Sequence, residues 1–245
     1  MSQIIQSTKM VNGVDLKTPP LIDPPPRAAI GEGPEKLNVV CVWWGDLYPI
    51  HYVENLRDMI ARHLTVPYEM FCITDRLVTP EGITHIPCQS QEGWWQKINL
   101  FKPGLFEGRT LYFDLDVVIT NSLDPIAKSE GDLVMIENFG PNKGHAAFNS
   151  SCMLWTPSEK TEKIYNSYED SISTILHGDQ CWIWRAFGND ILAFRKDLLD
   201  SYKYTKLGQW KRSSPDTAVW IFHGNPKPHQ ATESWVREHW TKNNS

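Results

Sequence analysis

The sequence predicts an α/β protein with one folded domain, built on a mixed, mostly parallel sheet that is flanked by helices. Its 245 residues are 41% apolar and 11% aromatic, which is enough to bury one sizeable core. The continuous apolar run LNVVCVW at 37–43 is typical of a strand covered on both faces of a sheet. A helical pattern and a second apolar run follow it, and this order indicates two parallel strands joined by a right-handed crossover.

The first 36 residues differ from the rest of the chain because they combine many prolines with little apolar periodicity. The prolines are Pro19, Pro20, Pro24, Pro25, Pro26 and Pro34. Such a composition favours extended chain over packed structure. We therefore expect residues 1–36 to form an extended or disordered arm outside the fold, and residues 37–245 to form the domain.

The elements of the domain are predicted in order from apolar spacing. Behind Pro49, apolar residues recur every three or four positions, which predicts a helix that ends near His63 and precedes the strand YEMFCIT at 68–74. A second helical segment, WWQKINLF at 94–101, leads to the most strand-like segment of the chain, TLYFDLDVVI at 110–119. Further strands are predicted near 133–137, 152–156, 190–195 and 218–222, and helices near 158–169 and 178–187.

Charge and composition narrow the function classes. The formal charge of −5 and the pI of about 5.9 make nucleic acid a poor first choice of partner. No stretch approaches the roughly 20 apolar residues of a membrane-spanning helix, so we expect a cytoplasmic protein without a transmembrane segment, although peripheral contact with a membrane stays open. The cysteines are odd in number and form no C-x-x-C pair, which favours buried thiols over a zinc site. They are Cys41, Cys72, Cys88, Cys152 and Cys181.

An acidic doublet stands at the end of the strand predicted at 110–119. Alternation along a strand points Asp114 and Asp116 to one face and Leu115 to the other. Two carboxylates about 4 Å apart repel each other by about 4 kcal/mol at an effective dielectric of 20, so a site that keeps both ionised usually holds a cation. Hard oxygen ligands suit Mg²⁺, Ca²⁺ or Mn²⁺, which often share their shell with a substrate diphosphate. The alternative is an Asp pair that caps a turn, and a D-x-D alone does not exclude it.

A second polar cluster follows an apolar strand near the C-terminus, in VWIFHGNPKPH at 219–229. His223 can offer an imidazole nitrogen, which favours Mn²⁺ over Mg²⁺. Gly224 allows the backbone to approach a phosphate, and Lys227 offers a point charge. The alternative is a histidine that is hydrogen-bonded at a strand end and followed by a proline-rich loop.

Four segments, taken together, resemble the retaining family 8 glycosyltransferases of the bacterial or phage type. They are FDLDVVI at 113–119, FNSSCMLW at 148–155, GDQCWI at 178–183 and FHGNPKPH at 222–229. The resemblance extends from about Leu37 to about Trp240 and implies a glycosyltransferase-A fold. It also implies that Asp114, Asp116 and His223 hold Mn²⁺ against the diphosphate of a nucleotide sugar.

The same resemblance assigns roles to further residues. Lys97 stands where the family usually has an arginine near the donor sugar, and Asn149 matches the asparagine that contacts this sugar. Asp179 matches an aspartate that contacts a sugar hydroxyl, and Gln180 matches a glutamine near the anomeric carbon. The end of the first strand is implied to supply the pocket for base and ribose. Its residues are Val42, Trp43 and Trp44, and Leu115 also belongs to the implied donor site.

The chemistry expected of these residues is sugar transfer with retention of anomeric configuration. The metal and Lys227 would stabilise the charge that develops on the leaving diphosphate. Gln180 is a poor nucleophile, so attack of the acceptor on the same face as the departing diphosphate is easier to reconcile with the sequence. An inverting enzyme would need a general base, and Asp179 is the only nearby matched carboxylate.

Two alternatives remain beside the transferase. One is a non-catalytic module that binds a nucleotide or glycan on the same fold. The other, less favoured, is a sugar nucleotidyltransferase, which needs a basic Gly-rich loop after the first strand where this chain has WWGDLYP. The family's usual donors are UDP-sugars, and the acceptor stays open among glycan, lipid-linked glycan, protein and small molecule. Most tryptophans are expected in the core, with one or two against ligand.

Overall fold

The computed structural model describes residues 10–20, 23–88, 92–139, 146–206 and 214–241. In this part of the chain a seven-stranded sheet has the order β10-β8-β9-β6-β3-β4-β5, with β9 antiparallel to its neighbours and the other strands parallel. Its strands are β3 (Leu37–Trp43), β4 (Tyr68–Thr74), β5 (Thr84–Pro87), β6 (Thr110–Phe113), β8 (Leu133–Glu137), β9 (Phe148–Trp155) and β10 (Leu192–Ala193). The predicted mixed, mostly parallel α/β fold is confirmed.

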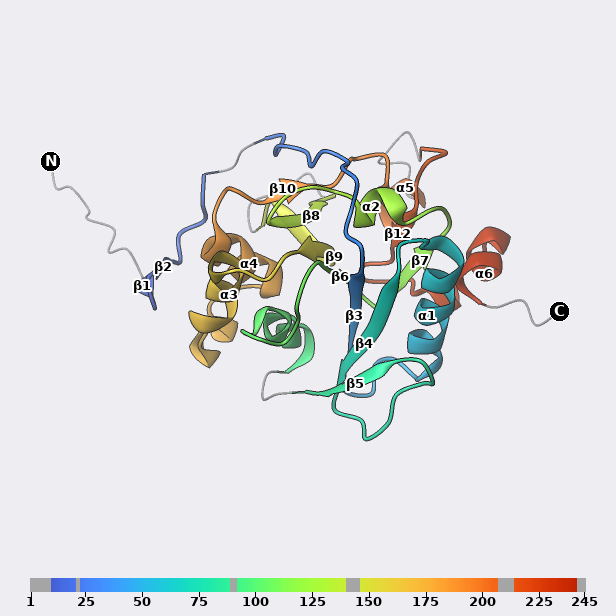
Figure 1. Ribbon diagram of the computed structural model, residues 1–245, viewed down its shortest axis with the longest axis horizontal. Helices are drawn as coiled ribbons and strands as arrows, with labels where there is room; N and C mark the ends of the chain where they lie inside the picture. Colours follow the sequence, from blue (N-terminus) through green and yellow to red (C-terminus); the bar gives the residue numbers. More distant parts are fainter. Residues whose placement is uncertain (1–9, 21–22, 89–91, 140–145, 207–213, 242–245) are drawn as a thin grey trace, which may run out of the picture.

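Two smaller sheets and a set of short helices complete the described fold (Figure 1). A three-stranded sheet has the order β11-β12-β7, with β7 (Val117–Ile119), β11 (Leu199–Ser201) and β12 (Val219–Ile221). A hairpin joins β1 (Met10–Val11) to β2 (Val14–Asp15). The helices are α1 (His51–His63), α2 (Asp124–Ala127), α3 (Glu159–Asn166), α4 (Asp179–Phe187), α5 (Tyr202–Lys206) and α6 (Ser234–Trp240), and the 3₁₀ helices are η1 (Gly93–Phe101), η2 (Asp170–Thr174) and η3 (Pro228–Gln230).

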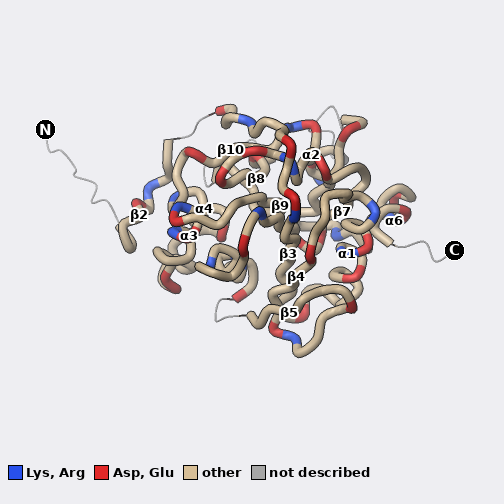
Figure 2. Tube along the Cα trace, viewed as in Figure 1, with Lys and Arg blue, Asp and Glu red and all other residues tan. Residues whose placement is uncertain are grey.

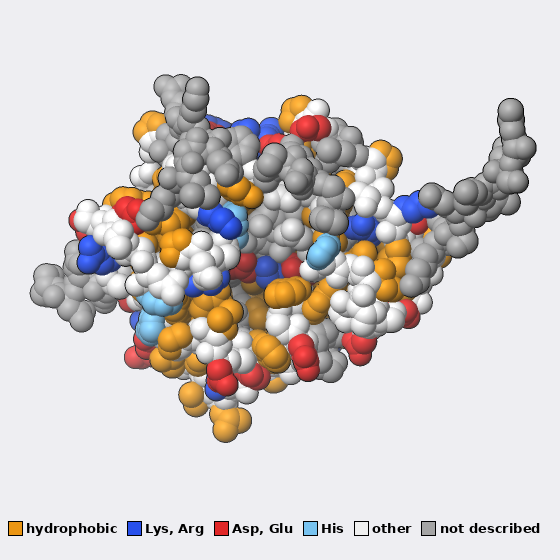
Figure 3. All heavy atoms as spheres, turned by 180° about the vertical axis from the view of Figure 1, so that it is seen from behind, with side chains coloured by type: hydrophobic (Ala, Val, Ile, Leu, Met, Phe, Trp, Pro, Cys, Tyr) orange, Lys and Arg blue, Asp and Glu red, His pale blue; other side chains and the backbone are white. Residues whose placement is uncertain are grey.

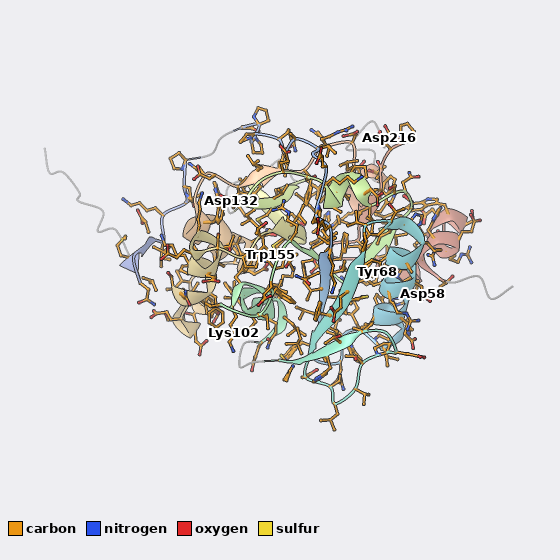
Figure 4. All side chains as sticks on the ribbon, viewed as in Figure 1. Asp58, Tyr68, Lys102, Asp132, Trp155 and Asp216 are labelled. Carbon is orange, nitrogen blue, oxygen red and sulfur yellow. The ribbon has the colours of Figure 1, made fainter. Side chains whose placement is uncertain are left out.

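Each face of the large sheet is covered by its own apolar core. Alternate residues of β3 divide between the cores, because Val39 and Cys41 join the one under α1 and α6 while Val40 joins the one under η1, α3 and α4. Trp155 at the end of β9 is buried between the sheet and η1, with its ring 5.1 Å from that of Phe101 (Figure 4). The continuous apolar runs of the sequence are thus explained by burial on both faces.

The predicted strand at 110–119 is corrected to two strands in two sheets. β6 ends at Phe113 in the large sheet, and β7 begins at Val117 in the small one. The residues between them, Asp114 to Asp116, form the crossing and belong to neither strand. Strand alternation therefore does not set the directions of their side chains. Their own contacts, described below, do.

The prediction of an arm outside the fold is wrong for the described part of residues 1–36. Val14 of the hairpin is 2% exposed and belongs to the core under α4. Arg185 of α4 also donates from Nε to the Leu16 carbonyl over 2.9 Å. Further on, Ala28 N donates to Ala193 O over 2.9 Å, and Ala193 N donates to Pro26 O over 2.8 Å. Scattered apolar residues and two-residue strands gave no periodic signal, although they are sufficient to bind the arm to the domain.

Charged residues of both signs are interspersed over the structure (Figure 2). All five cysteines are described and free, and only Cys88 is not fully buried. Within the described residues, none of the helices has the length and apolar character needed to cross a membrane.

Candidate active site

The acidic doublet lies at the edge where the parallel strands of the large sheet end. At this edge Asp114 N donates to Ser151 O of β9 over 2.9 Å. On the other side of the crossing, Phe222 N donates to Asp116 O over 3.2 Å, in line with the antiparallel pairing of β12 with β7. The residue after Phe222 is His223. The small sheet therefore brings the two polar clusters of the sequence next to each other, at the position where open α/β sheets usually bind ligands.

Lys97 is the buried cation beside Asp114. Its Nζ lies 2.8 Å from Asp114 Oδ1, and Tyr112 OH donates to the same oxygen over 2.5 Å. Lys97 projects from η1, which the sequence predicted as a helical segment and which the structure shows as a 3₁₀ helix. Lys97 is 8% exposed. Burial alone would lower the pKa of Lys97, but Asp114 and Asp179 outweigh it, and the pKa is raised. The ammonium group is therefore held charged at neutral pH.

The same ammonium connects the doublet to the start of α4. Lys97 Nζ lies 3.9 Å from Asp179 Oδ2 and donates to Ser150 Oγ over 3.1 Å. Asp179 is the first residue of α4 and is 5% exposed. Burial raises the pKa of Asp179 despite the opposing effect of Lys97, and its Oδ2 has no hydrogen-bond partner. This oxygen is a buried acceptor that a substrate hydroxyl would satisfy.

Asp116 has a different cation. Lys227 Nζ lies 2.5 Å from its Oδ2, and Tyr48 OH donates to that oxygen over 2.9 Å. Burial and the neighbouring Asp114 raise the pKa of Asp116, although Lys227 counteracts them. The two carboxylates are thus close enough to repel each other, and each is compensated by one lysine.

His223 follows the strand that pairs beside the doublet, but its side chain forms its hydrogen bond with another residue. Its Nε2 is 2.6 Å from Ser201 Oγ at the end of β11, and its ring stacks on Phe139 at 5.8 Å between centroids. Burial, followed by the charges of Lys203 and Lys227, lowers the pKa of His223 to about 4. The imidazole is therefore neutral at pH 7, which is the form that ligates metal ions.

The turn after His223 places Lys227. Gly224 has φ of +72°, a left-handed conformation that favours glycine, while a Cβ added there would meet only Lys203 Nζ at 3.8 Å. Lys227 N donates to Gln230 Oε1 over 2.8 Å, which fixes the backbone of Lys227 at the start of η3.

The formal charges of the site are balanced. Three carboxylates (Asp114, Asp116, Asp179) face two ammonium groups (Lys97, Lys227), and a third ammonium group, that of Lys203, lies on the side of the neutral His223 imidazole. This donor set fits a divalent cation chemically. No three Asp, Glu, His or Cys side chains are grouped as ligands of one ion anywhere in the part of the chain that the structure describes. The set Asp114, Asp116 and His223 is thus not preassembled and stays a prediction.

A cavity of about 430 Å³ opens beside this cluster. Asp179 and Gln180 line it together with Trp94, whose indole is 59% exposed.

Asn149, predicted at the donor sugar, lies at the start of β9, where its Oδ1 accepts from Ser151 N over 2.9 Å. Trp182 and Trp184 are core residues, as expected for most tryptophans, and Trp210 lies outside the described residues.

The end of β3, where the base and ribose pocket is predicted, is only partly accessible. Trp43 is 6% exposed, donates from Nε1 to the Tyr48 carbonyl over 2.7 Å and carries the Arg76 guanidinium 5.4 Å above its ring. Val42 and Trp44 are half-buried, and Leu115 is buried at 2% exposure. The assignment of these residues to a nucleotide stays a prediction.

The sequence did not indicate several groups that hold the charged cluster. Tyr112 stands two residues before Asp114, and Ser150 follows Asn149, so both lie in segments already singled out. Tyr48 and Ser201 stand in no motif of the sequence, because only the folded chain brings them to Asp116 and His223.

On the face shown in Figure 3, the surface is hollowed near its centre, and acidic and basic side chains lie side by side there.

Comparisons with known proteins find solved structures of similar fold. No protein-family model matches the chain. No curated protein matches it. Glycosyltransferase GlyE of Streptococcus pneumoniae TIGR4 is similar in structure, with a TM-score of 0.64 and 15% identity over 85% of this chain and 61% of that chain. The chain thus spans about 61% of the length of GlyE.

Two further solved structures are similar. Galactosyltransferase LgtC, in complex with donor and acceptor sugar analogs, gives a TM-score of 0.54 and 15% identity over 78% of this chain and 88% of that chain. The bifunctional glycosyltransferase WbbM gives a TM-score of 0.58 and 10% identity over 82% of this chain and 48% of that chain. At these identities the likeness shows that the chain has the mixed α/β fold of these glycosyltransferases.

Proposed function

We propose that the chain is a metal-dependent glycosyltransferase of the family 8 type, which transfers a hexose from a nucleoside diphosphate donor, expected to be a UDP-sugar, with retention of configuration. The observation that carries the proposal is the charged cluster at the carboxyl edge of the sheet. There Asp114 and Asp116 meet Lys97 and Lys227 in the fold that the chain shares with GlyE and LgtC.

The D-x-D and His223 would hold Mn²⁺, or Mg²⁺ in its place. A bound divalent ion supplies Lewis acidity and positive charge to the departing diphosphate. Lys227 could then leave Asp116 and donate to a diphosphate oxygen. His223 is neutral at pH 7, and as a ligand it would exchange its hydrogen bond with Ser201 for the metal ion.

Residues on the other side of the cluster would bind and orient the sugar. Asp179 Oδ2, buried and without a hydrogen-bond partner, accepts from a sugar hydroxyl, and Lys97 lies 3.9 Å from this oxygen. Gln180 lines the same cavity, so its amide can lie beside the anomeric carbon. LgtC, with which the chain shares its fold, has an active-site glutamine whose replacement by glutamate has been studied structurally.

The surroundings of Asp179 support retention over inversion. A general base must reach the hydroxyl of the acceptor, whereas Asp179 is 5% exposed and its unpartnered Oδ2 is assigned here to a hydroxyl of the donor sugar. The leaving diphosphate is then the group that takes the acceptor proton on the same face of the sugar. NMR analysis of the anomeric configuration of the product tests this point, and an inverted product contradicts it.

A thermal-shift panel of nucleotide sugars with and without Mn²⁺ tests the function itself. A ligand at 100 times its dissociation constant adds about 2.7 kcal/mol of apparent stability. We expect a response to one base that requires metal, and nucleotide release when donor and Mn²⁺ are both present. Asp114→Asn should abolish both and leave the circular dichroism spectrum unchanged. Binding without any nucleotide release would instead indicate the non-catalytic module.

A further inference from the structure

A second cavity adjoins the one beside Gln180. The first, which we call the reaction pocket, has about 430 Å³ and is lined by Trp94, Asn138, Asp179 and Gln180 among others. The second, which we call the distal pocket, has about 310 Å³. It is lined by Arg27, Asn138, Phe139, Arg195 and Leu199 among others. Because Asn138 lines both, the two pockets adjoin each other.

The distal pocket and the expected nucleotide pocket lie at different halves of the large sheet. Its residues follow the ends of β8 and β10, whereas the base and ribose are expected at the end of β3. In the sheet order, β9 and β6 separate β8 from β3, and the acidic doublet follows β6. A donor that runs from β3 across the doublet reaches the reaction pocket with its sugar. The distal pocket then lies beyond that sugar, on the acceptor side.

The arm at 23–31 builds one side of the distal pocket. Arg27 forms an ion pair with Glu137 at the end of β8 and donates from Nη1 to the Phe194 carbonyl over 2.9 Å. Nearby, Arg195 donates from Nε to Asp197 Oδ1 over 3.1 Å. The lining contains three acidic and three basic side chains, so the pocket presents hydrogen-bonding groups without a strong net charge.

Part of the remaining lining is apolar and flat, and it lies beside the charged Asp23, Lys196 and Asp200. Phe139 borders the pocket and stacks on His223, so the pocket wall touches the predicted metal ligand. Pro24 and Leu199 add further apolar surface. Flat apolar surface combined with charge-paired donors and acceptors matches a sugar ring, which offers C–H faces and a rim of hydroxyls. A lipid chain would leave the charged groups of the lining desolvated, and a strongly anionic ligand would meet as many acidic as basic side chains.

We propose that the acceptor is an oligosaccharide whose reacting sugar lies in the reaction pocket and whose preceding sugar lies in the distal pocket. Each volume falls at the lower end of the roughly 300–1,000 Å³ of small-molecule sites, as expected for one or two sugar rings per pocket. The proposal rests on the proposed function for its chemical step. In that step an acceptor oxygen bonds to the anomeric carbon, the bond from this carbon to the diphosphate breaks, and the hydroxyl proton leaves with the diphosphate.

Acceptor length is the variable that tests the proposal. The probe is a panel of defined mono- to tetrasaccharides of glucose, galactose and N-acetylglucosamine, assayed by saturation-transfer NMR without donor and by nucleotide release with donor and Mn²⁺. We expect binding and kcat/KM to rise at least tenfold from mono- to disaccharide in one series. Equal values for every length, or no binding by any member, would overturn the proposal.

Two variants locate the effect in the distal pocket. Arg27→Ala and Arg195→Ala should each reduce the ratio of disaccharide to monosaccharide kcat/KM at least tenfold, while Lys160→Ala on α3, whose ammonium pairs with Asp190, should not. Arg195 is half exposed, so its variant folds even where loss of Arg27 loosens the arm. Unchanged ratios in both variants would overturn the distal assignment. Metal-dependent donor binding without length dependence removes this inference alone, whereas length-dependent glycan binding without any donor response removes the proposed function alone.

Discussion

Lys227 Nζ lies 2.5 Å from Asp116 Oδ2, so a lysine from the C-terminal part of the chain compensates the second carboxylate of the D-x-D. The two side chains are 18% and 9% exposed, which makes this a partly buried ion pair. A cation that binds Asp116 through Oδ2 therefore competes with the lysine for this oxygen.

Replacing this lysine should separate metal binding from catalysis. In Lys227→Met, Asp116 keeps its bond from Tyr48 but loses its counter-charge, and we expect the metal-free protein to lose about 1–3 kcal/mol of unfolding free energy. Mn²⁺ should bind the variant more tightly than the wild type in calorimetry, while turnover falls because the diphosphate has lost a donor. Lys160→Met serves as the surface control. Weaker Mn²⁺ binding in Lys227→Met would contradict the competition.

The buried Lys97 pair should be strongly coupled in stability. In metal-free urea unfolding, Lys97→Met should cost about 3–5 kcal/mol because it leaves Asp114 and Asp179 without their cation. In a double-mutant cycle with Asp114→Asn we expect a coupling of about 0.5–3 kcal/mol. The exposed pair of Lys36 and Glu69 gives the matched control, with coupling of about 0–1 kcal/mol. Equal coupling in the two pairs would show that burial of Lys97 contributes nothing.

The adjacent tryptophans of η1 should have opposite roles. Trp95 is 8% exposed and packs 5.6 Å from the Tyr168 ring, so Trp95→Ala should cost about 3–5 kcal/mol of unfolding free energy. Trp94 is 59% exposed, and Trp94→Ala should change stability by no more than about 0.5 kcal/mol. Because Trp94 lines the reaction pocket, its loss should raise the KM for acceptor about two- to tenfold. An unchanged KM would place the indole outside the site.

Two histidines between α1 and α6 should make the fold sensitive to acid. His63 and His239 have ring centroids 6.2 Å apart, and burial followed by Arg62 lowers the pKa of both. Their folded pKa values lie below the unfolded value of about 6.5, so the unfolded state binds more protons and stability falls as pH drops below that value. His239→Gln should therefore flatten the fall in unfolding free energy between about pH 7 and pH 5. The exposed His85→Gln is the control, and an equal slope change there would contradict the assignment.

The sequence predicted the fold best where packing follows from local pattern. β3, α1 and β4 lie where apolar runs and helical spacing placed them, because both faces of the sheet and one face of α1 are buried. The break between β6 and β7 was not predicted, since 110–119 is apolar throughout and only the pairing of β7 with β12 draws it into another sheet. Short strands such as β10 and β11 carry too few residues for a periodic signal.

Several of the residues predicted for one site lie together in the structure, but the sequence did not predict how they pair with one another. The structure places Lys97 between Asp114 and Asp179, three residues that the sequence had assigned to one site. It also pairs Asp116 with Lys227, whereas the sequence gave one to the metal and the other to the diphosphate. Such pairings depend on side-chain reach across the fold, which spacing along the chain does not encode.

The position of the arm beside β10 has a consequence for solubility. β10 is an outer strand of the large sheet, and Pro26 and Ala28 hydrogen-bond with Ala193 along its free side. Pro24, Pro25 and Pro26 themselves lack N–H groups, so the added segment is a poor template for another strand. A chain shortened to begin at Leu37 would leave β10 open to pairing with other molecules, and we expect it to aggregate even where its core still folds.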